Sequence, residues 1–136
     1  MPVAKIHVLD GQYDDARLGK VSSAVQDGLI RALGIPPEDF FQIIHVLPRR
    51  QFLHTPSFLA LTYTDDLILL EITFISGRPK GTRLGLLKAL NDGVVAAAEI
   101  SPDDLVIMLY ETPGENISLG RGLAQRARIP DTEVTG

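Results

Sequence analysis

The segment LGIPPEDFFQIIHVL, residues 33–47, decides the fold, because the chain carries a second version of it in AEISPDDLVIMLYET, residues 98–112. Each segment holds a turn with an isoleucine, a proline and two acidic residues, followed by an apolar stretch. Asp104 follows Asp39 by 65 positions (104 − 39 = 65). The other pairs at this offset are Ile35 with Ile100, Pro37 with Pro102 and Glu38 with Asp103. A constant offset of this kind indicates an internal duplication.

The residues ahead of each copy of the turn predict a strand and then a helix. The apolar residues Leu18, Val21 and Val25 recur every three or four positions, as they do on one face of a helix. Asp14 favours the start of this helix through the helix dipole, and Gly34 favours its end. The expected elements are strand 3–9, helix 14–33 and strand 40–47 in the first half, and strand 67–75, helix 82–98 and strand 105–111 in the second.

Two such β-α-β units predict an α/β (α+β) fold. Because β-α-β crossovers are right-handed, the repeats should form a four-stranded mixed sheet with two helices on one face. The strand sequences LVIMLY and FFQIIHVL are apolar at almost every position, as in strands buried on both faces. Two helices on one face leave the other face bare, so we expect a homo-oligomer to cover it.

Length and composition favour one domain. A chain of 136 residues with 45% apolar content can bury one core, which we place at residues 1–125. Pro48 begins a looser connection with a candidate short strand at 58–63. Residues 126–136 read as a polar tail, and we expect the last several of them to be mobile.

Charge and residue types exclude several kinds of partner. The chain has 13 basic and 17 acidic residues and 6% aromatic residues, so we expect no nucleic-acid partner. We expect a cytoplasmic protein with no membrane contact, because there is no membrane-length apolar run and no signal-peptide pattern. The absence of cysteine excludes a thiol nucleophile and disulfides. His7, His45 and His54 lack metal-ligand spacing, and we expect neither a metal nor another cofactor.

Pro2 is the first candidate for chemistry. Removal of Met1 would leave a secondary amine at the chain terminus, and an α-amino group has an ordinary pKa of about 7.7–8.0. Such a group can act as a general base, as a general acid, or as a nucleophile toward a carbonyl. Many proteins begin Met-Pro without catalytic meaning, but here the proline leads directly into a strand that would fix its position.

Arg78 and Asp39 are expected near this terminus. The two repeats run antiparallel, so the start of strand 40–47 and the end of strand 67–75 should lie at the edge of the sheet that holds Pro2. Arg78 follows that end, in a loop with two further cations that opens the second helix, which suggests a carboxylate site. Asp39 has a simpler explanation too, because its repeat partner Asp104 occupies the same turn and such residues commonly bond the backbone.

These features together resemble the tautomerase superfamily, and within it the malonate semialdehyde decarboxylase group. The similarity spans residues 2 to about 125 and includes the Met-Pro start, the motif GIPPEDFFQIIH, the loop SGRPKGT and a late ENISLGRG. The resemblance implies that Pro2 is catalytic, that Asp39 assists it, and that Arg78 binds the substrate carboxylate. It also implies a homotrimer.

The chain departs from the decarboxylase pattern in two places. Where that pattern has two arginines separated by one residue, this loop has Arg78 and Lys80, and Ser76 is the other position that could stand for the second arginine. Ile117 and Leu119 stand where the pattern usually has tryptophan and phenylalanine, so they imply an apolar substrate wall of another shape. Lysine is a point charge where arginine is a two-pronged clamp, so the substrate acid would be oriented differently.

The expected function is therefore that of an amino-terminal-proline enzyme acting on a small oxo carboxylic acid. The resemblance favours a lyase that decarboxylates or hydrates, like malonate semialdehyde decarboxylase. The alternative enzyme is an isomerase, a keto–enol tautomerase of a 2-oxo acid such as phenylpyruvate. A non-catalytic module that binds a small acid is a further alternative, because one fold hosts many functions. The sequence leaves open whether Pro2 is neutral or charged at pH 7.

Overall fold

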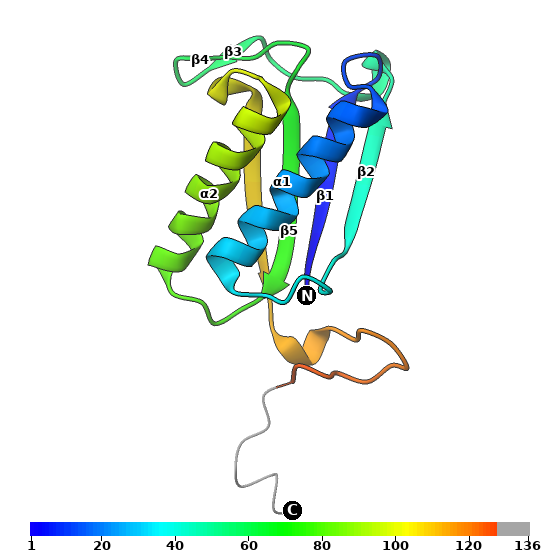
Figure 1. The fold of residues 1–136 in the computed structure, drawn as a ribbon, viewed down its shortest axis with the longest axis vertical. Helices are drawn as coiled ribbons and strands as arrows, with labels where there is room; N and C mark the ends of the chain where they lie inside the picture. Colours follow the sequence, from blue (N-terminus) through cyan, green and yellow to red (C-terminus); the bar gives the residue numbers. More distant parts are fainter. Residues whose placement is uncertain (128–136) are drawn as a thin grey trace, which may run out of the picture.

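The structure is a computed structural model that describes residues 1–127. It contains two β-α-β units with a small hairpin between them (Figure 1). The first unit is β1 (Pro2–Leu9), α1 (Asp15–Leu33) and β2 (Gln42–Leu47), the hairpin is β3 (Ser57–Phe58) and β4 (Leu61–Thr62), and the second unit is β5 (Ile68–Ile75), α2 (Lys80–Ala98) and β6 (Leu105–Thr112). Residues 128–136, most of the expected polar tail, lie outside the described part.

The two helices show the internal repeat most clearly. Each has 19 residues, and α2 begins and ends 65 positions after α1 (80 − 15 = 65; 98 − 33 = 65). The Asp14 side chain caps α1 by accepting a hydrogen bond from the Arg17 N–H at 2.7 Å. The second helix begins at Lys80 instead of the expected residue 82, because Pro79 has a φ of −62°, which already suits the entry to a helix.

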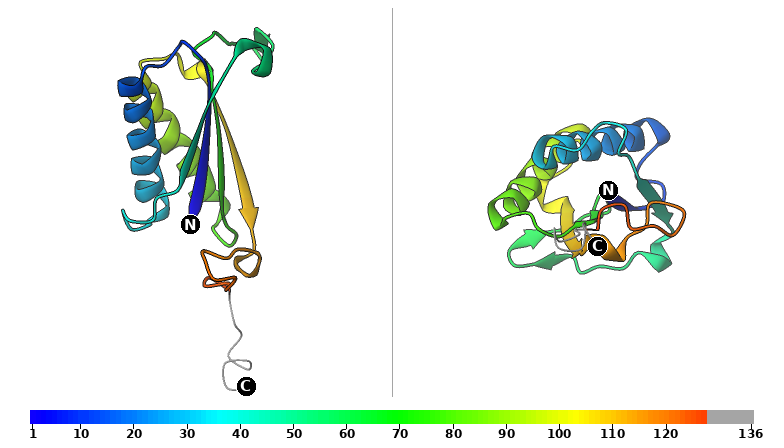
Figure 2. Two further views of the ribbon diagram at one scale, coloured as in Figure 1. Left: turned by 90° about the vertical axis from the view of Figure 1, so that its right-hand side faces the viewer. Right: turned by 90° about the horizontal axis from the view of Figure 1, so that it is seen from below.

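The four long strands form one mixed sheet in the order β2-β1-β5-β6. The two central strands, β1 and β5, are antiparallel, while β2 and β6 each pair in parallel with their own repeat partner. Both helices lie on one face of this sheet (Figure 2). The expected four-stranded mixed sheet with two helices on one face is thus confirmed.

The core fills the space between the sheet and the helices. Alternate residues of the central strands point toward the helices and are fully buried, as Ile6 and Phe74 illustrate. They pack against Leu29 of α1 and Leu90 of α2. Burial stabilises each such side chain by about 1.5–3 kcal/mol. The helices approach closely at Gly28, where an added Cβ would stand 3.0 Å from a methyl group of Leu90.

The opposite face of the sheet carries a row of polar side chains across its four strands. The Nδ1 atoms of His45 and His7 lie 3.1 Å apart, and Nε2 of His7 lies 2.6 Å from a carboxylate oxygen of Glu71. The Tyr110 hydroxyl donates to the other Glu71 oxygen at 3.0 Å. The hydrogen bond with His7 holds the pKa of Glu71 below its ordinary value. Neither helix covers this row (Figure 2).

The connection between the repeats differs from the expected single strand at 58–63. Leu59 and Ala60 have positive φ angles of 52° and 62° and form the tight turn of a hairpin that joins β3 to β4. The apolar residues had indicated a continuous strand, and the turn interrupts it. Within residues 1–127, no helix is both long and apolar enough to cross a membrane.

Candidate functional site

The candidate site lies at the end of the sheet where β1 and β2 begin and β5 ends, near the label N in Figure 1. A pocket of about 310 Å³ opens here. Charged groups from four separate segments line it, namely Met1, Asp39, Arg78 and Arg126. Its remaining walls are the end of α1 and the turn after it, at residues 33–36, and Ile75. The pocket therefore collects residues that are far apart in the sequence.

Asp39 is held in place by contacts of its backbone. The side-chain amide of Gln26, on α1, donates to the Asp39 carbonyl at 3.0 Å, and the Asp39 N–H donates to the Pro36 carbonyl at 3.0 Å. The following residues join the sheet, where Ala4 donates to the Phe41 carbonyl at 3.0 Å. The turn is thus fixed to α1 on one side and to β1 on the other.

The Asp39 carboxylate is only 13% exposed and faces the chain terminus. Its Oδ2 atom pairs with the Met1 ammonium group. Its Oδ1 atom is buried and has no hydrogen-bond partner within residues 1–127. A buried carboxylate oxygen without a donor is costly, so a proton or a hydrogen-bond donor at this atom would be stabilising. Pro2, next along the chain, is buried and in register with Phe74 of β5.

Arg78 lies across the pocket from the turn, just after the end of β5. One of its N–H groups donates to the Ile75 carbonyl at 3.3 Å, and its guanidinium lies 5.7 Å from the centre of the Phe74 ring. These contacts hold the side chain in place. A guanidinium has five N–H donors in all. Most of its donors therefore remain available for an anion in the pocket.

Arg126 is the site residue that sequence reasoning missed. It lines the same pocket as Asp39 and Arg78, and also an adjoining pocket of about 410 Å³. The sequence assigned it to a polar tail, because nothing in its local pattern shows that residues 114–127 fold back under the sheet. The one residue that reflects this fold-back is Gly114, 12 positions earlier (126 − 114 = 12), where an added Cβ would stand 2.1 Å from the Arg126 carbonyl oxygen.

The other predicted site residues, and Pro2 itself, are not among the residues that line this pocket. Ser76 lines the adjoining pocket of about 410 Å³. Lys80 lines a different pocket of about 400 Å³, together with Arg83 and Glu111, between α2 and β6. Ile117 and Leu119 line none of these three pockets.

The charges of the pocket favour an anion. The terminal ammonium, Arg78 and Arg126 are cationic, and Asp39 is the one carboxylate among the lining residues. Guanidinium groups bind carboxylates through paired hydrogen bonds. Within residues 1–127, no group of three or more His, Asp or Glu side chains is arranged to hold a metal ion. The arrangement can bind a small acid beside an amine and a carboxylate.

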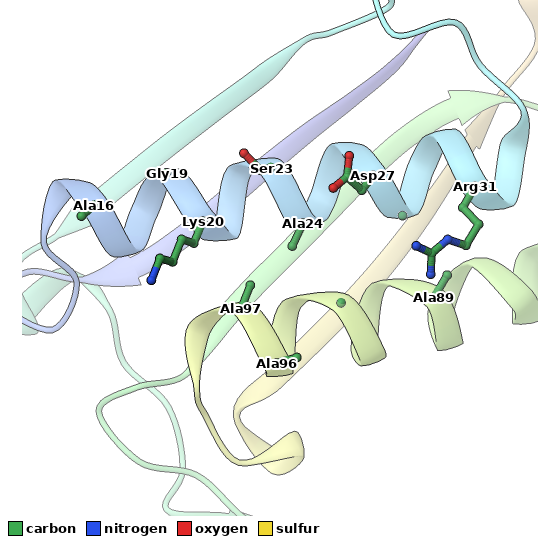
Figure 3. Close-up of a pocket in the computed structure, with 12 residues that line it drawn as sticks. Ala16, Gly19, Lys20, Ser23, Ala24, Asp27, Arg31, Ala89, Ala96 and Ala97 are labelled. Carbon is green, nitrogen blue, oxygen red and sulfur yellow. The ribbon is translucent and has the colours of Figure 1, made fainter.

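A second depression, of about 800 Å³, lies between α1 and α2 on their solvent side (Figure 3). Small residues form most of it, and the charged side chains of Lys20, Asp27 and Arg31 are spread along one helix. It holds no pair of groups arranged for acid–base chemistry. The pocket beside Asp39 is therefore the better candidate despite its smaller volume.

Comparison with known proteins identifies the family of the chain. A family model described as "Tautomerase enzyme" matches residues 39–120. The probable tautomerases YusQ and YrdN of Bacillus subtilis (strain 168) are 27% and 25% identical to this chain over 125 residues, which is 92% of the chain and 98% and 95% of those proteins.

Two solved structures share the fold. A malonate semialdehyde decarboxylase has a TM-score of 0.82 and 23% identity, covering 90% of this chain and 94% of its own. A fused 4-OT, solved as a symmetric trimer, has a TM-score of 0.75 and 19% identity, covering 89% of this chain and 94% of its own. With a family model matching more than half of its length, the chain belongs to the tautomerase family.

Proposed function

We propose that this protein is an amino-terminal-proline enzyme that acts on a small oxo carboxylic acid. One observation carries the proposal: the chain terminus pairs with Asp39 in a pocket that also contains Arg78. In an enzyme lacking Met1, the Pro2 nitrogen becomes the terminal amine, one residue from the present Met1 ammonium. A short shift of Pro2 toward Asp39 would place that amine where the Met1 ammonium now lies.

The proposed roles follow from the chemistry of each group. Arg78 binds the substrate carboxylate, which directs the reacting carbon toward Pro2. The amine transfers a proton or polarises the oxo group, and Asp39 orients the amine or a water molecule. The burial of Asp39 Oδ1 supports this role, because an oxygen without a protein donor can accept a hydrogen bond from water or from the terminal amine.

Two reactions are compatible with these roles. We favour decarboxylation or hydration of a 3-oxo acid such as malonate semialdehyde, because the fold and the Met-Pro start resemble that branch. Carbon dioxide then leaves as the carbon–carbon bond breaks, and the electron pair is accepted by an oxo group polarised by Pro2. The alternative is keto–enol tautomerisation, in which Pro2 moves a proton between carbon and oxygen. The names of the two Bacillus relatives favour this alternative.

The chain terminus provides the first test. Intact-mass analysis should show that Met1 is absent, and incubation with 3-bromopropiolate should add one stoichiometric adduct at Pro2. This reagent inhibits one of the structurally similar decarboxylases. Retained methionine and no adduct would contradict the enzyme and favour a module that only binds a small acid.

Kinetics provide the second test. Malonate semialdehyde decarboxylation and phenylpyruvate tautomerisation should both be assayed, because the larger kcat/KM identifies the reaction. Pro2→Ala should reduce that activity strongly, since it replaces a secondary amine with a primary one. Arg78→Ala should mainly raise KM, and kinetic constants equal to those of the parent would contradict its carboxylate-binding role.

We further propose that the protein forms a homotrimer with its sheets facing inward. Supporting this, the sheet face opposite the helices carries the His45–His7–Glu71–Tyr110 row, and burial inside an assembly would strengthen these hydrogen bonds. The similar fused 4-OT is a symmetric trimer. Light scattering should give a mass of three chains, and a stable monomer would overturn this assignment.

A further inference from the structure

Arg126 stands where the two pockets of the sheet edge meet. The pocket of about 310 Å³ contains Asp39 and Arg78, and the adjoining pocket of about 410 Å³ contains Ser76, Gly77 and Gly114. Ile75 and Arg126 line both. A ligand in either pocket would therefore lie beside residue 126, whose positive charge favours an anion in both.

The backbone around Arg126 is built for this position. Its carbonyl oxygen passes so close to Gly114 that an added Cβ would stand 2.1 Å away, a distance no side chain tolerates. Gly114 lies two residues after the end of β6, so this contact ties residue 126 to the end of the sheet. Only glycine at position 114 permits the segment to lie where it does.

The segment before Arg126 is also held by its own hydrogen bonds. The Gln125 side chain accepts from the Leu119 N–H at 2.9 Å and donates to the Gly120 carbonyl at 2.9 Å. The Ala127 N–H donates to the Ala124 carbonyl at 3.2 Å. Residues 119–127 therefore form a closed loop of their own, and Arg126 is delivered from a fixed backbone.

We propose that Arg126 is a second substrate-binding residue, which holds the acid together with Arg78. This inference rests on the proposed function, because it assigns the second cation of that same site. Lys80 lines a different pocket, and Ser76 carries no charge. The second guanidinium therefore comes from the end of the chain instead of from the loop after β5.

The test measures binding of malonate, a small acid that lacks an oxo group and so forms no iminium with an amine. Isothermal titration calorimetry compares the parent with Arg126→Ala, Arg126→Lys and Arg121→Ala. We expect Arg126→Ala to weaken binding about ten-fold, the size of effect that corresponds to about 1.4 kcal/mol. Arg126→Lys should recover part of the loss, because lysine restores the charge without the paired donors.

Arg121→Ala is the matched control. It removes the same charge from the same loop, and Arg121 lines neither of the two pockets. Its malonate affinity should equal that of the parent. Equal losses in Arg121→Ala and Arg126→Ala would show a general charge effect and overturn the assignment of Arg126.

Gly114→Ala tests the position of Arg126 while keeping its side chain. The added methyl must displace the Arg126 carbonyl, so malonate binding should weaken as it does in Arg126→Ala. Combining both substitutions should give no further loss, because each removes the same interaction. Fully additive losses would mean that Gly114 acts independently of Arg126, and would overturn the positioning argument.

The outcomes separate this inference from the proposed function. If the parent forms the Pro2 adduct and binds malonate, and Arg126→Ala binds malonate equally well, the active site stands and the role of Arg126 is overturned. If the parent forms no adduct and binds no malonate, both are overturned. Circular dichroism and thermal unfolding of each variant distinguish a lost contact from a lost fold.

Discussion

The same turn occurs at both ends of the sheet, but the hydrogen bonds of its aspartate differ between the two ends. At one end Asp104 is 2% exposed, and its carboxylate accepts hydrogen bonds from the Thr64 N–H at 2.8 Å and from the Thr64 hydroxyl. At the other end Asp39 pairs with the chain terminus through one oxygen, and its other oxygen has no hydrogen-bond partner among the described residues. The two turns thus carry an aspartate at the same position, and the hydrogen bonds of its carboxylate differ between them.

The difference comes from the segments next to each repeat. Thr64 belongs to the connection between the repeats, which approaches the Asp104 turn and satisfies its carboxylate. The Asp39 turn meets the free end of the chain and the loops after β5 and β6, which bring cations. The Asp104 carboxylate is thus satisfied by neutral donors, whereas the pocket beside Asp39 contains an amine and two guanidinium groups.

The largest difference between the two ends should appear in activity. Asp39→Asn keeps the size of the side chain but removes its charge, so kcat/KM should fall by about 100-fold or more, as expected for a proton-transfer group. Its thermal unfolding midpoint should fall only moderately, because Asp39→Asn weakens the ion pair of Oδ2 with the chain terminus, while Oδ1 has no hydrogen-bond partner within residues 1–127 to lose. A large drop in stability with normal kinetics would make Asp39 a second structural aspartate.

The reciprocal change at the other end should affect stability. Asp104→Ala removes the acceptor of two hydrogen bonds from Thr64, and we expect a loss of about 2 kcal/mol in the free energy of unfolding. Urea denaturation measures this loss. The activity of the folded fraction should be unchanged. Asp103→Ala, on the preceding residue, removes the acceptor of one exposed hydrogen bond, from the Thr62 N–H at 3.0 Å, and should cost less.

The sequence predicted most of the fold because the duplication repeats its signals. The spacing of apolar residues and the positions of turn residues predict both helices, all four long strands and the sheet face that no helix covers. Asp39 and Arg78 were expected at one edge because strand direction alone sets which ends meet, and they line one pocket. The sequence did not predict Arg126 as a site residue, because its position depends on how a loop folds back on Gly114. That is a long-range contact that no local pattern encodes. Lys80 lines a different pocket from Arg78 because it belongs to the first turn of α2, and the sequence did not predict where that turn begins.

The helix ends offer a smaller comparison. Gly34, after α1, and Glu99, after α2, both adopt the left-handed conformation, with φ of 68° and 55°. Glycine adopts it freely and glutamate does not. Gly34→Ala should therefore destabilise the protein by about 1 kcal/mol, and Glu99→Gly should stabilise it by up to about 1 kcal/mol. Urea denaturation of both variants measures this, and shifts of the same sign would contradict the explanation.

The smallest effect at neutral pH concerns Tyr13, which lies at the Asp104 end. Its hydroxyl donates to the Asp66 carbonyl, and burial raises the Tyr13 pKa well above the ordinary value of about 10, against an opposing effect of Arg17. The folded protein thus holds this proton more tightly than the unfolded chain does.

The sign of the pH dependence follows from this shift. The stabilisation is complete below about pH 10, where Tyr13 is protonated in both states, and it is lost as the pH rises above that value, because the unfolded chain then releases the proton first. The free energy of unfolding should therefore fall between about pH 10 and 12 in the parent and fall less steeply in Tyr13→Phe. Tyr110→Phe is the control on the sheet face opposite the helices, where the hydrogen bond with Glu71 raises the Tyr110 pKa. If the free energy of unfolding depends on pH in the same way in the parent and in Tyr13→Phe, the proton of the buried Tyr13 hydroxyl is not coupled to folding.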